Sequence, residues 1–139
     1  MPAKDHYHDA VKRALIKDGW NIIEEQVKLN CGVRRLWIDL LAGKADQNLV
    51  VLIEVKGFEN SPSAVEELAN AVGQYIIYQA ALAVKNQVIP LFLAVPNTAF
   101  FGILSEVLGQ QVRAQIGIRL LVFDPVEEEI IEWLPSLTR

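Results

Sequence analysis

The order of helical and strand-like segments in this chain, αβββαβαββ, predicts an α/β fold with a mixed sheet. Three strand-like segments follow one another through short polar connections, which is typical of an antiparallel meander. Residues 49–56 and 88–95 are apolar runs on either side of a long helical segment, and strands joined across a helix run parallel. A length of 139 residues fits one domain, so we expect a single-domain α/β sandwich over residues 1–139.

The N-terminal half is predicted to hold one helix and the meander. Residues 5–18 carry apolar side chains three and four positions apart, with Asp5 as the candidate cap and Gly19 as the stop. The last strand of the meander is apolar on both faces, as expected for a central strand that helices cover on both sides. The expected strands span residues 20–29, 33–41 and 49–56.

The C-terminal half is predicted to hold the long helix, a further helical segment and three strands. Ser61 and Pro62 have the residue types expected at the cap and first position of the long helix, which runs to about Lys85. Pro90 lies inside the next expected strand, where a proline indicates an edge position or a bulge because it has no N–H to donate. The expected segments are strand 88–95, helix 97–113 and strands 116–123 and 129–134.

Composition narrows the class of protein. Apolar residues make up 52% of the chain and the mean hydropathy is +0.24, which excludes an intrinsically disordered chain. No apolar stretch approaches the roughly 18 residues of a membrane span, and the first residues lack the apolar core of a signal peptide. A single cysteine, Cys31, excludes an internal disulfide and a zinc cluster. We therefore expect a cytoplasmic protein that does not bind a membrane.

Charge is unevenly distributed along the chain. The net charge is −4, which argues against a broadly basic nucleic-acid-binding surface. Residues 1–56 hold nine Lys and Arg against eight Asp and Glu, whereas residues 57–139 hold four against nine. The basic character therefore lies in the half that carries the candidate site.

The candidate site consists of Asp39 and the element Glu54-Val55-Lys56. Glu54 and Lys56 point to the same face of their strand, and a hairpin turning within 43–48 brings Asp39 opposite residues 51–54. Two carboxylates this close repel each other unless a hard cation such as Mg²⁺ lies between them. Lys56 then orients or deprotonates the attacking water, or stabilises charge on the phosphate. A purely structural ion pair at the sheet end is the alternative.

This arrangement resembles the core of the PD-(D/E)XK nuclease superfamily, a restriction-endonuclease-like fold in which a meander ends in Glu-x-Lys before a long helix. The resemblance implies that Asp39, Glu54 and the backbone carbonyl of Val55 bind Mg²⁺ or Mn²⁺, with Lys56 as the catalytic lysine. Ile38 stands where the superfamily name has a proline, a position that the chemistry does not need.

Two further segments extend this resemblance. Gln74 and Tyr78 match the Gln-x-x-x-Tyr signature of RecB-like members, and one helical turn separates them, so they share a face directed at the strand ends. His8 stands where first-helix members often carry a glutamate. It either contacts a phosphate or a water at the site, or is a helix-face histidine held by a hydrogen bond.

More closely, the chain resembles the cyanobacterial XisH family of fdxN-element excision controlling factors. The segments that carry this resemblance are 5–11, 14–20, Glu54-Val55-Lys56 with Phe58, and Gly73-Gln74-Tyr75. It implies a nuclease-like protein that takes part in site-specific DNA rearrangement and acts with DNA, a recombinase or another excision factor. The alternative is a non-catalytic regulatory factor that binds a recombinase or a partner excision protein through the same fold.

The long helix is apolar on several faces. One stripe runs from Val65 through Ile76 to Ala83, and Ile77, Ala81 and Val84 extend it around the helix. Such a helix is either deeply buried or packed against another chain. In a domain of this size we expect a homo-oligomer.

Overall fold

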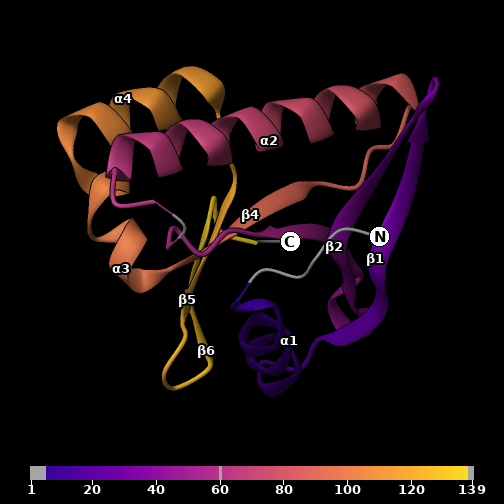
Figure 1. The fold of residues 1–139 in the computed structure, drawn as a ribbon. Helices are drawn as coiled ribbons and strands as arrows, with labels where there is room; N and C mark the ends of the chain where they lie inside the picture. The colour runs from indigo at the N-terminus through magenta and orange to yellow at the C-terminus, as the bar shows by residue number, and fades with distance from the viewer. Residues whose placement is uncertain (1–5, 60, 138–139) are drawn as a thin grey trace.

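The computed structural model describes residues 6–59 and 61–137, which fold around one six-stranded sheet (Figure 1). The strands are β1 (Asn21–Cys31), β2 (Arg34–Lys44), β3 (Leu49–Val55), β4 (Leu91–Pro96), β5 (Leu120–Asp124) and β6 (Glu129–Leu134). The helices are α1 (His8–Lys17), α2 (Ala64–Val84), α3 (Asn97–Phe100) and α4 (Val107–Ile116), with 3₁₀ turns at Ala45–Gln47 and Ile103–Ser105.

The sheet is mixed and its strands lie in chain order, β1-β2-β3-β4-β5-β6. β1, β2 and β3 form the predicted antiparallel meander; β3, β4 and β5 are parallel; β6 returns antiparallel to β5. The predicted mixed α/β fold and its order of segments are therefore confirmed. Asp5, the expected cap of the first helix, lies outside the described residues.

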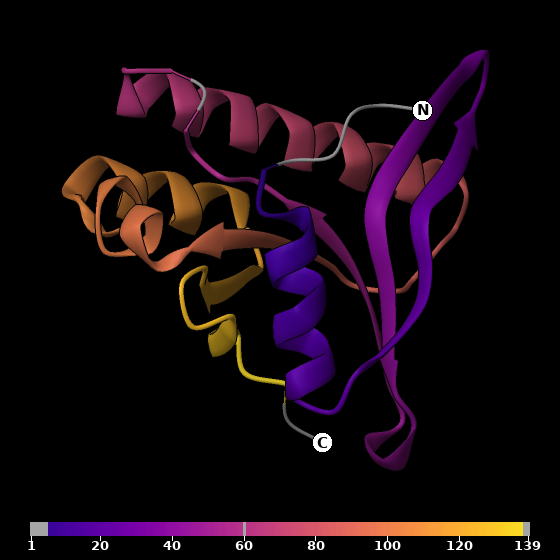
Figure 2. The same ribbon diagram turned by 60° about the horizontal axis from the view of Figure 1, so that its bottom comes forward.

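Two apolar layers cover the two faces of the sheet. Leu68, Tyr75 and Leu82 of α2 pack with one set of strand residues, including Leu52 and Leu93. α1 packs on the other set through Val11 and Leu15, against Ile53 and Phe92 among others. Figure 2 shows α1 on one face and α2 with α4 on the other. Since side chains of a strand alternate between faces, covering both faces demands the nearly continuous apolar runs seen in the sequence.

β4 corrects the prediction for Pro90. The strand begins at Leu91 and lies between β3 and β5, so it is a central strand rather than an edge. Pro90 precedes it, and its carbonyl accepts a hydrogen bond from the Leu52 N–H at 2.9 Å. Pro90 therefore causes no bulge, because β3 bonds to its carbonyl and not to the N–H that a proline lacks.

The start of α2 also differs from the prediction. The helix begins at Ala64, and the Oγ of Ser63 accepts a hydrogen bond from the Glu66 N–H at 3.2 Å, so Ser63 is the cap. Ser61, the predicted cap, instead accepts from the Ser63 N–H at 3.1 Å. Two serines two residues apart compete for the same position, and the one that forms the i to i+3 bond decides where the helix starts.

The predicted helical segment 97–113 consists of α3, a 3₁₀ turn and α4. α4 continues to Ile116, where Gly117 ends it with a φ of 70°. β5 consequently begins at Leu120, four residues later than predicted. Within the described part of the chain, no helix has the length and apolarity needed to cross a membrane.

Candidate active site

The candidate site lies where β2 separates from β3. The paired register of the two strands ends at Leu40 and Ile53, and its continuation places Asp39 opposite Glu54, within the predicted range 51–54. Beyond this point β2 pairs with β1, while β3 pairs with β4. The β1–β2 hairpin accordingly extends away from the rest of the sheet as an arm (Figures 1 and 2).

The two carboxylates take over hydrogen bonds that the strands no longer exchange. Asp39 Oδ2 accepts from the Val55 N–H at 2.7 Å, and Glu54 Oε1 accepts from the Asp39 N–H at 3.2 Å. Asp39 is 6% exposed and Glu54 is 7% exposed. Buried backbone N–H groups need partners, so these carboxylates hold the two strands together at the point where they part.

Gln26 is a member of the site that the sequence did not indicate. It lies in β1 with a φ of 51°, in the left-handed region, between residues that pair regularly with β2. Its Nε2 donates to Asp39 Oδ1 at 3.3 Å, and its buried Oε1 has no hydrogen-bond partner among the described residues. A left-handed glutamine inside a strand is strained, and such strain is concentrated at functional sites.

His8 lies beside Asp39, as part of a short chain of polar contacts. Its Nε2 is 3.0 Å from Glu25 Oε1, and its Nδ1 is 3.8 Å from Asp39 Oδ1. Lys12 Nζ donates to Glu25 Oε2 at 2.9 Å. The hydrogen bonds from Lys12 and then His8 lower the pKa of Glu25, against a smaller opposing effect of burial. His8 is thus both hydrogen-bonded and adjacent to the site.

Tyr78 reaches the same site from α2. Burial, followed by the charges of Glu54 and Asp39, raises the pKa of its phenol to about 12. The hydroxyl therefore keeps its proton at neutral pH and remains a hydrogen-bond donor. Contacts among described residues thus bring together three of the predicted site residues, namely Asp39, Glu54 and His8, and Tyr78 lies near enough for the charges of Glu54 and Asp39 to act on its phenol.

The other two predicted site residues, Gln74 and Lys56, lie close to Tyr78 and Glu54 along the chain. Gln74 is half-buried one helical turn before Tyr78. Lys56 is also half-buried and follows β3 directly, where its backbone N–H donates to the Ala94 carbonyl at 2.9 Å. Between Gln74 and Tyr78, the fully buried Tyr75 has a structural role, because its hydroxyl donates to the Leu91 carbonyl at 3.0 Å and accepts from the Arg119 N–H at 3.2 Å.

The chemistry of the donors suits a hard cation. Asp39, Glu54 and the Val55 carbonyl offer oxygen atoms, and the orphaned Gln26 Oε1 adds another. Mg²⁺ and Mn²⁺ prefer oxygen ligands of this kind, whereas the imidazole of His8 suits them poorly. Among the described residues no group of three or more His, Cys, Asp or Glu side chains forms a metal-binding cluster. A cation bound here would therefore need the Gln26 amide oxygen and the Val55 carbonyl oxygen in addition to the two carboxylates.

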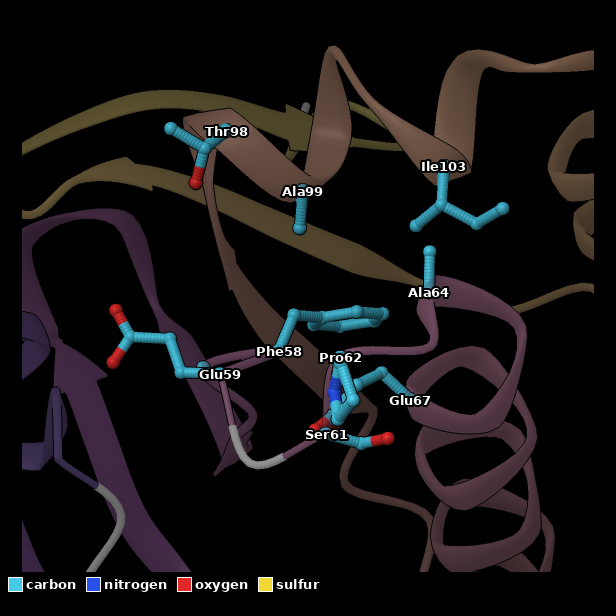
Figure 3. Close-up of a pocket in the computed structure, with 10 residues that line it drawn as sticks. Phe58, Glu59, Ser61, Pro62, Ala64, Glu67, Thr98, Ala99 and Ile103 are labelled. Atoms are coloured by element: carbon cyan, nitrogen blue, oxygen red, sulfur yellow. The ribbon is translucent and has the colours of Figure 1, made fainter.

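A cavity of about 280 Å³ lies beside the loop that follows Lys56 (Figure 3). It lies between the loop that begins at Gly57, the first turn of α2, and the segment from Thr98 to Ile103. Phe58, with a φ of 60°, forms part of its wall. Glu67 extends from α2 into this lining; it is 1% exposed, and neither carboxylate oxygen has a hydrogen-bond partner among the described residues.

Comparison with known proteins identifies the family. The family model described as XisH protein matches residues 1–131. The chain belongs to the XisH family. A solved structure of an XisH family protein from Nostoc punctiforme is 31% identical and superposes with a TM-score of 0.85, covering 93% of this chain and 98% of that one.

A second solved structure agrees with the first. It is an fdxN element excision controlling factor protein from Anabaena variabilis, 31% identical, with a TM-score of 0.84 and coverage of 91% of this chain and 96% of that one. No curated protein sequence matches the chain significantly. The family match and the high coverage of both structures confirm the resemblance to the XisH family seen in the sequence.

Proposed function

We propose that this XisH family protein takes part in element excision by hydrolysing DNA phosphodiesters at a divalent-cation site. The proposal rests on one observation: two buried carboxylates, Asp39 and Glu54, lie opposite each other where β2 leaves β3. The name of the Anabaena variabilis relative, an excision controlling factor, supports a role in site-specific DNA rearrangement.

The proposed roles follow from chemical type and position. Asp39, Glu54 and the Val55 carbonyl would hold Mg²⁺ or Mn²⁺, which when bound supplies positive charge and lowers the pKa of a coordinated water. Lys56 orients the water or neutralises charge on the phosphate. The phenol of Tyr78, which is protonated at neutral pH, donates a hydrogen bond to the substrate.

The remaining residues position these groups. Gln74, one turn before Tyr78, orients Lys56 or the substrate. His8, held by Glu25, keeps the carboxylate of Asp39 in place. None of these roles requires a broadly basic surface, and the net charge of −4 fits a protein whose DNA is presented by a partner such as a recombinase.

Cleavage assays test the proposal directly. Mn²⁺-dependent cleavage of branched, single-stranded and duplex DNA is measured for wild type, Glu54→Ala and Glu54→Gln. We expect a loss of at least about 100-fold in both variants. Gln keeps an acceptor for the Asp39 N–H, so it separates loss of chemistry from loss of folding. Equal rates in wild type and Glu54→Gln, or no cleavage of any substrate, would contradict the catalytic proposal.

Calorimetric titration tests the cation site apart from turnover. We expect wild type to bind Mn²⁺ and Asp39→Asn to lose this binding, because an amide oxygen replaces a charged ligand. Asp46→Asn is the matched control, since Asp46 is an exposed aspartate on the same β2–β3 hairpin. If Asp39→Asn and Asp46→Asn bind Mn²⁺ equally well, Asp39 is not a ligand.

A regulatory, non-catalytic function is the second candidate. It is favoured by the engagement of both carboxylates with backbone N–H groups, which gives Asp39 and Glu54 a structural reason to be present. On this view the protein binds a recombinase or a partner excision protein through the same fold. Unchanged partner binding by Glu54→Gln, together with absence of Mn²⁺ binding by wild type, would favour this function over hydrolysis.

A further inference from the structure

The outward face of α2 is apolar and exposed. From Leu68 to Val84 the helix has no charged residue. Val65, Ile76, Ile77 and Val84 are 55%, 45%, 57% and 65% exposed. Val65, Ile76 and Ala83 of the predicted stripe are exposed. Leu68, Tyr75 and Leu82 are buried, and Val72 packs against the core beneath the helix. A continuous apolar helix face in water indicates an interaction surface.

We propose that this face binds the same face of a second copy, with the two α2 helices antiparallel. The outer stripe of α2 consists of Val65, Ala69, Gly73, Ile76, Ala80 and Val84. The order of residue types in this stripe is nearly symmetric: a valine lies at each end, an alanine follows each valine, and Gly73 and Ile76 lie at the centre. A two-fold axis passing between residues 74 and 75 places each residue opposite its counterpart, as an isologous interface requires.

Charge selects the antiparallel arrangement over a parallel one. α2 carries Glu66 and Glu67 in its first turn, and Lys85 follows its last residue. An antiparallel pair brings Glu66 of one copy near Lys85 of the other, whereas a parallel pair brings Glu66 against Glu66. Antiparallel packing also sets opposite ends of the two helix dipoles side by side, which is favourable.

Gly73 supplies an independent reason for the close approach of another helix. It lies in the middle of α2, where glycine destabilises a helix by roughly 0.5–1 kcal/mol relative to alanine. A Cβ added at Gly73 would meet nothing within 4 Å, so packing within the described fold does not require a glycine at this position. In the antiparallel pair Gly73 faces Ile76 of the second copy, and a glycine there admits that side chain and lets the backbones approach.

The interface leaves the candidate active site free. Tyr75 and Leu82 face the sheet, and Tyr78 packs against the same core cluster, all on the side of α2 opposite the outer stripe. Dimerisation and cation binding are therefore independent properties. α2 has 21 residues and is roughly 30 Å long, so one helix pair gives an interface at the small end of stable ones. We accordingly expect a dissociation constant in the micromolar range.

Sedimentation equilibrium across the micromolar range tests the dimer. Wild type should pass from monomer to dimer, and Ile76→Arg should raise the dissociation constant at least ~100-fold, because each dimer buries two such substitutions. Val126→Arg is the matched control: Val126 is 84% exposed at the turn between β5 and β6, and its substitution should leave the constant unchanged. A wild-type protein that stays monomeric throughout the concentration range would overturn the proposal. This holds even if the monomer binds a different protein through this face.

Disulfide trapping tests the orientation. In a Cys31→Ser background, which removes the native free thiol, Ala69→Cys and Ala80→Cys proteins are oxidised separately and as a mixture. An antiparallel pair places residue 69 opposite residue 80, so the cross-linked dimer should form chiefly in the mixture. Cross-linking of each variant with itself alone would indicate a parallel pair, and no cross-linking in any sample would exclude the interface. Undiminished Mn²⁺ binding by Ile76→Arg would show that folding and the metal site are intact.

Discussion

At the scale of single residues, Asp39 and Glu54 combine two roles. Their carboxylates satisfy the Val55 and Asp39 N–H groups, and the same oxygens are the hard donors of the proposed cation site. Desolvating two carboxylates costs free energy, and the hydrogen bonds that each accepts offset part of it. The carboxylates of the proposed site are therefore also part of the hydrogen bonding between β2 and β3.

This double role predicts different stabilities for two substitutions of Asp39. Asp39→Ala should lower the free energy of unfolding by about 1–3 kcal/mol, because it leaves the buried Val55 N–H without a partner. Asp39→Asn keeps an oxygen acceptor and should cost clearly less. Urea denaturation of both variants without divalent cations measures the difference. Equal losses would mean that the hydrogen bond to Val55 contributes little.

Glu67 presents the opposite case, a buried carboxylate that accepts nothing from the described residues. Replacing it with the neutral, equally large glutamine should raise the free energy of unfolding by about 1–3 kcal/mol. Glu66→Gln is the control, since Glu66 is exposed in the same helical turn and its charge interacts favourably with the helix dipole. Thermal unfolding at neutral pH compares the stabilities of wild type, Glu67→Gln and Glu66→Gln. A Glu67→Gln protein less stable than wild type would show that a partner satisfies this carboxylate.

At the scale of elements, α1 is fastened to β1 by Glu25, which contacts both Lys12 and His8. Hydrogen bonds from these groups lower the pKa of Glu25 below its ordinary value of 4.5. A carboxyl group whose pKa is lowered by folding stabilises the fold above its unfolded pKa, and this contribution is lost as pH falls through the folded pKa.

Stability measured against pH should therefore separate wild type from Glu25→Gln. The difference in unfolding free energy should be fully present at pH 6 and should shrink as pH falls below about 4.5 towards the lowered pKa. Glu24→Gln, at the neighbouring exposed position of β1, is the control and should show a smaller change. Denaturation curves across this pH range provide the measurement. A difference that grows on acidification would contradict the assigned sign.

The elements also show what the sequence was able to predict. Apolar runs and short connections predict the meander, the parallel crossover and the register of Asp39 against Glu54, because all three depend on chain length and side-chain alternation. Gln26 was not predictable, since its left-handed backbone depends on the partner strand and on Asp39. Glu67 likewise is an ordinary first-turn acid in the sequence, and only the tertiary structure shows that it is 1% exposed.

At the scale of the whole molecule, the sheet divides into a core and an arm. β3, β4 and β5 are almost entirely buried and have a strand on each side. The outer parts of β1 and β2, residues 27–31 and 34–38, pair only with each other, and Val33 at their turn is 97% exposed. Two-stranded structures are marginal by themselves, so the arm depends on its contact with α2 and on the junction at Asp39.

Native-state hydrogen exchange should resolve these two parts. Amides of β4 and β5 should exchange through global unfolding, whereas amides of residues 27–31 and 34–38 should exchange faster through local opening of the arm. Asp39→Ala removes the carboxylate that binds the arm to Val55, so it should speed exchange in the arm by about tenfold, equivalent to ~1.4 kcal/mol. Asp46→Ala, in the 3₁₀ turn beyond the other end of β2, should leave amide exchange in the arm unchanged. Uniform acceleration of all strands by Asp39→Ala would mean that arm and core unfold together, and that the junction supports the whole sheet rather than the arm alone.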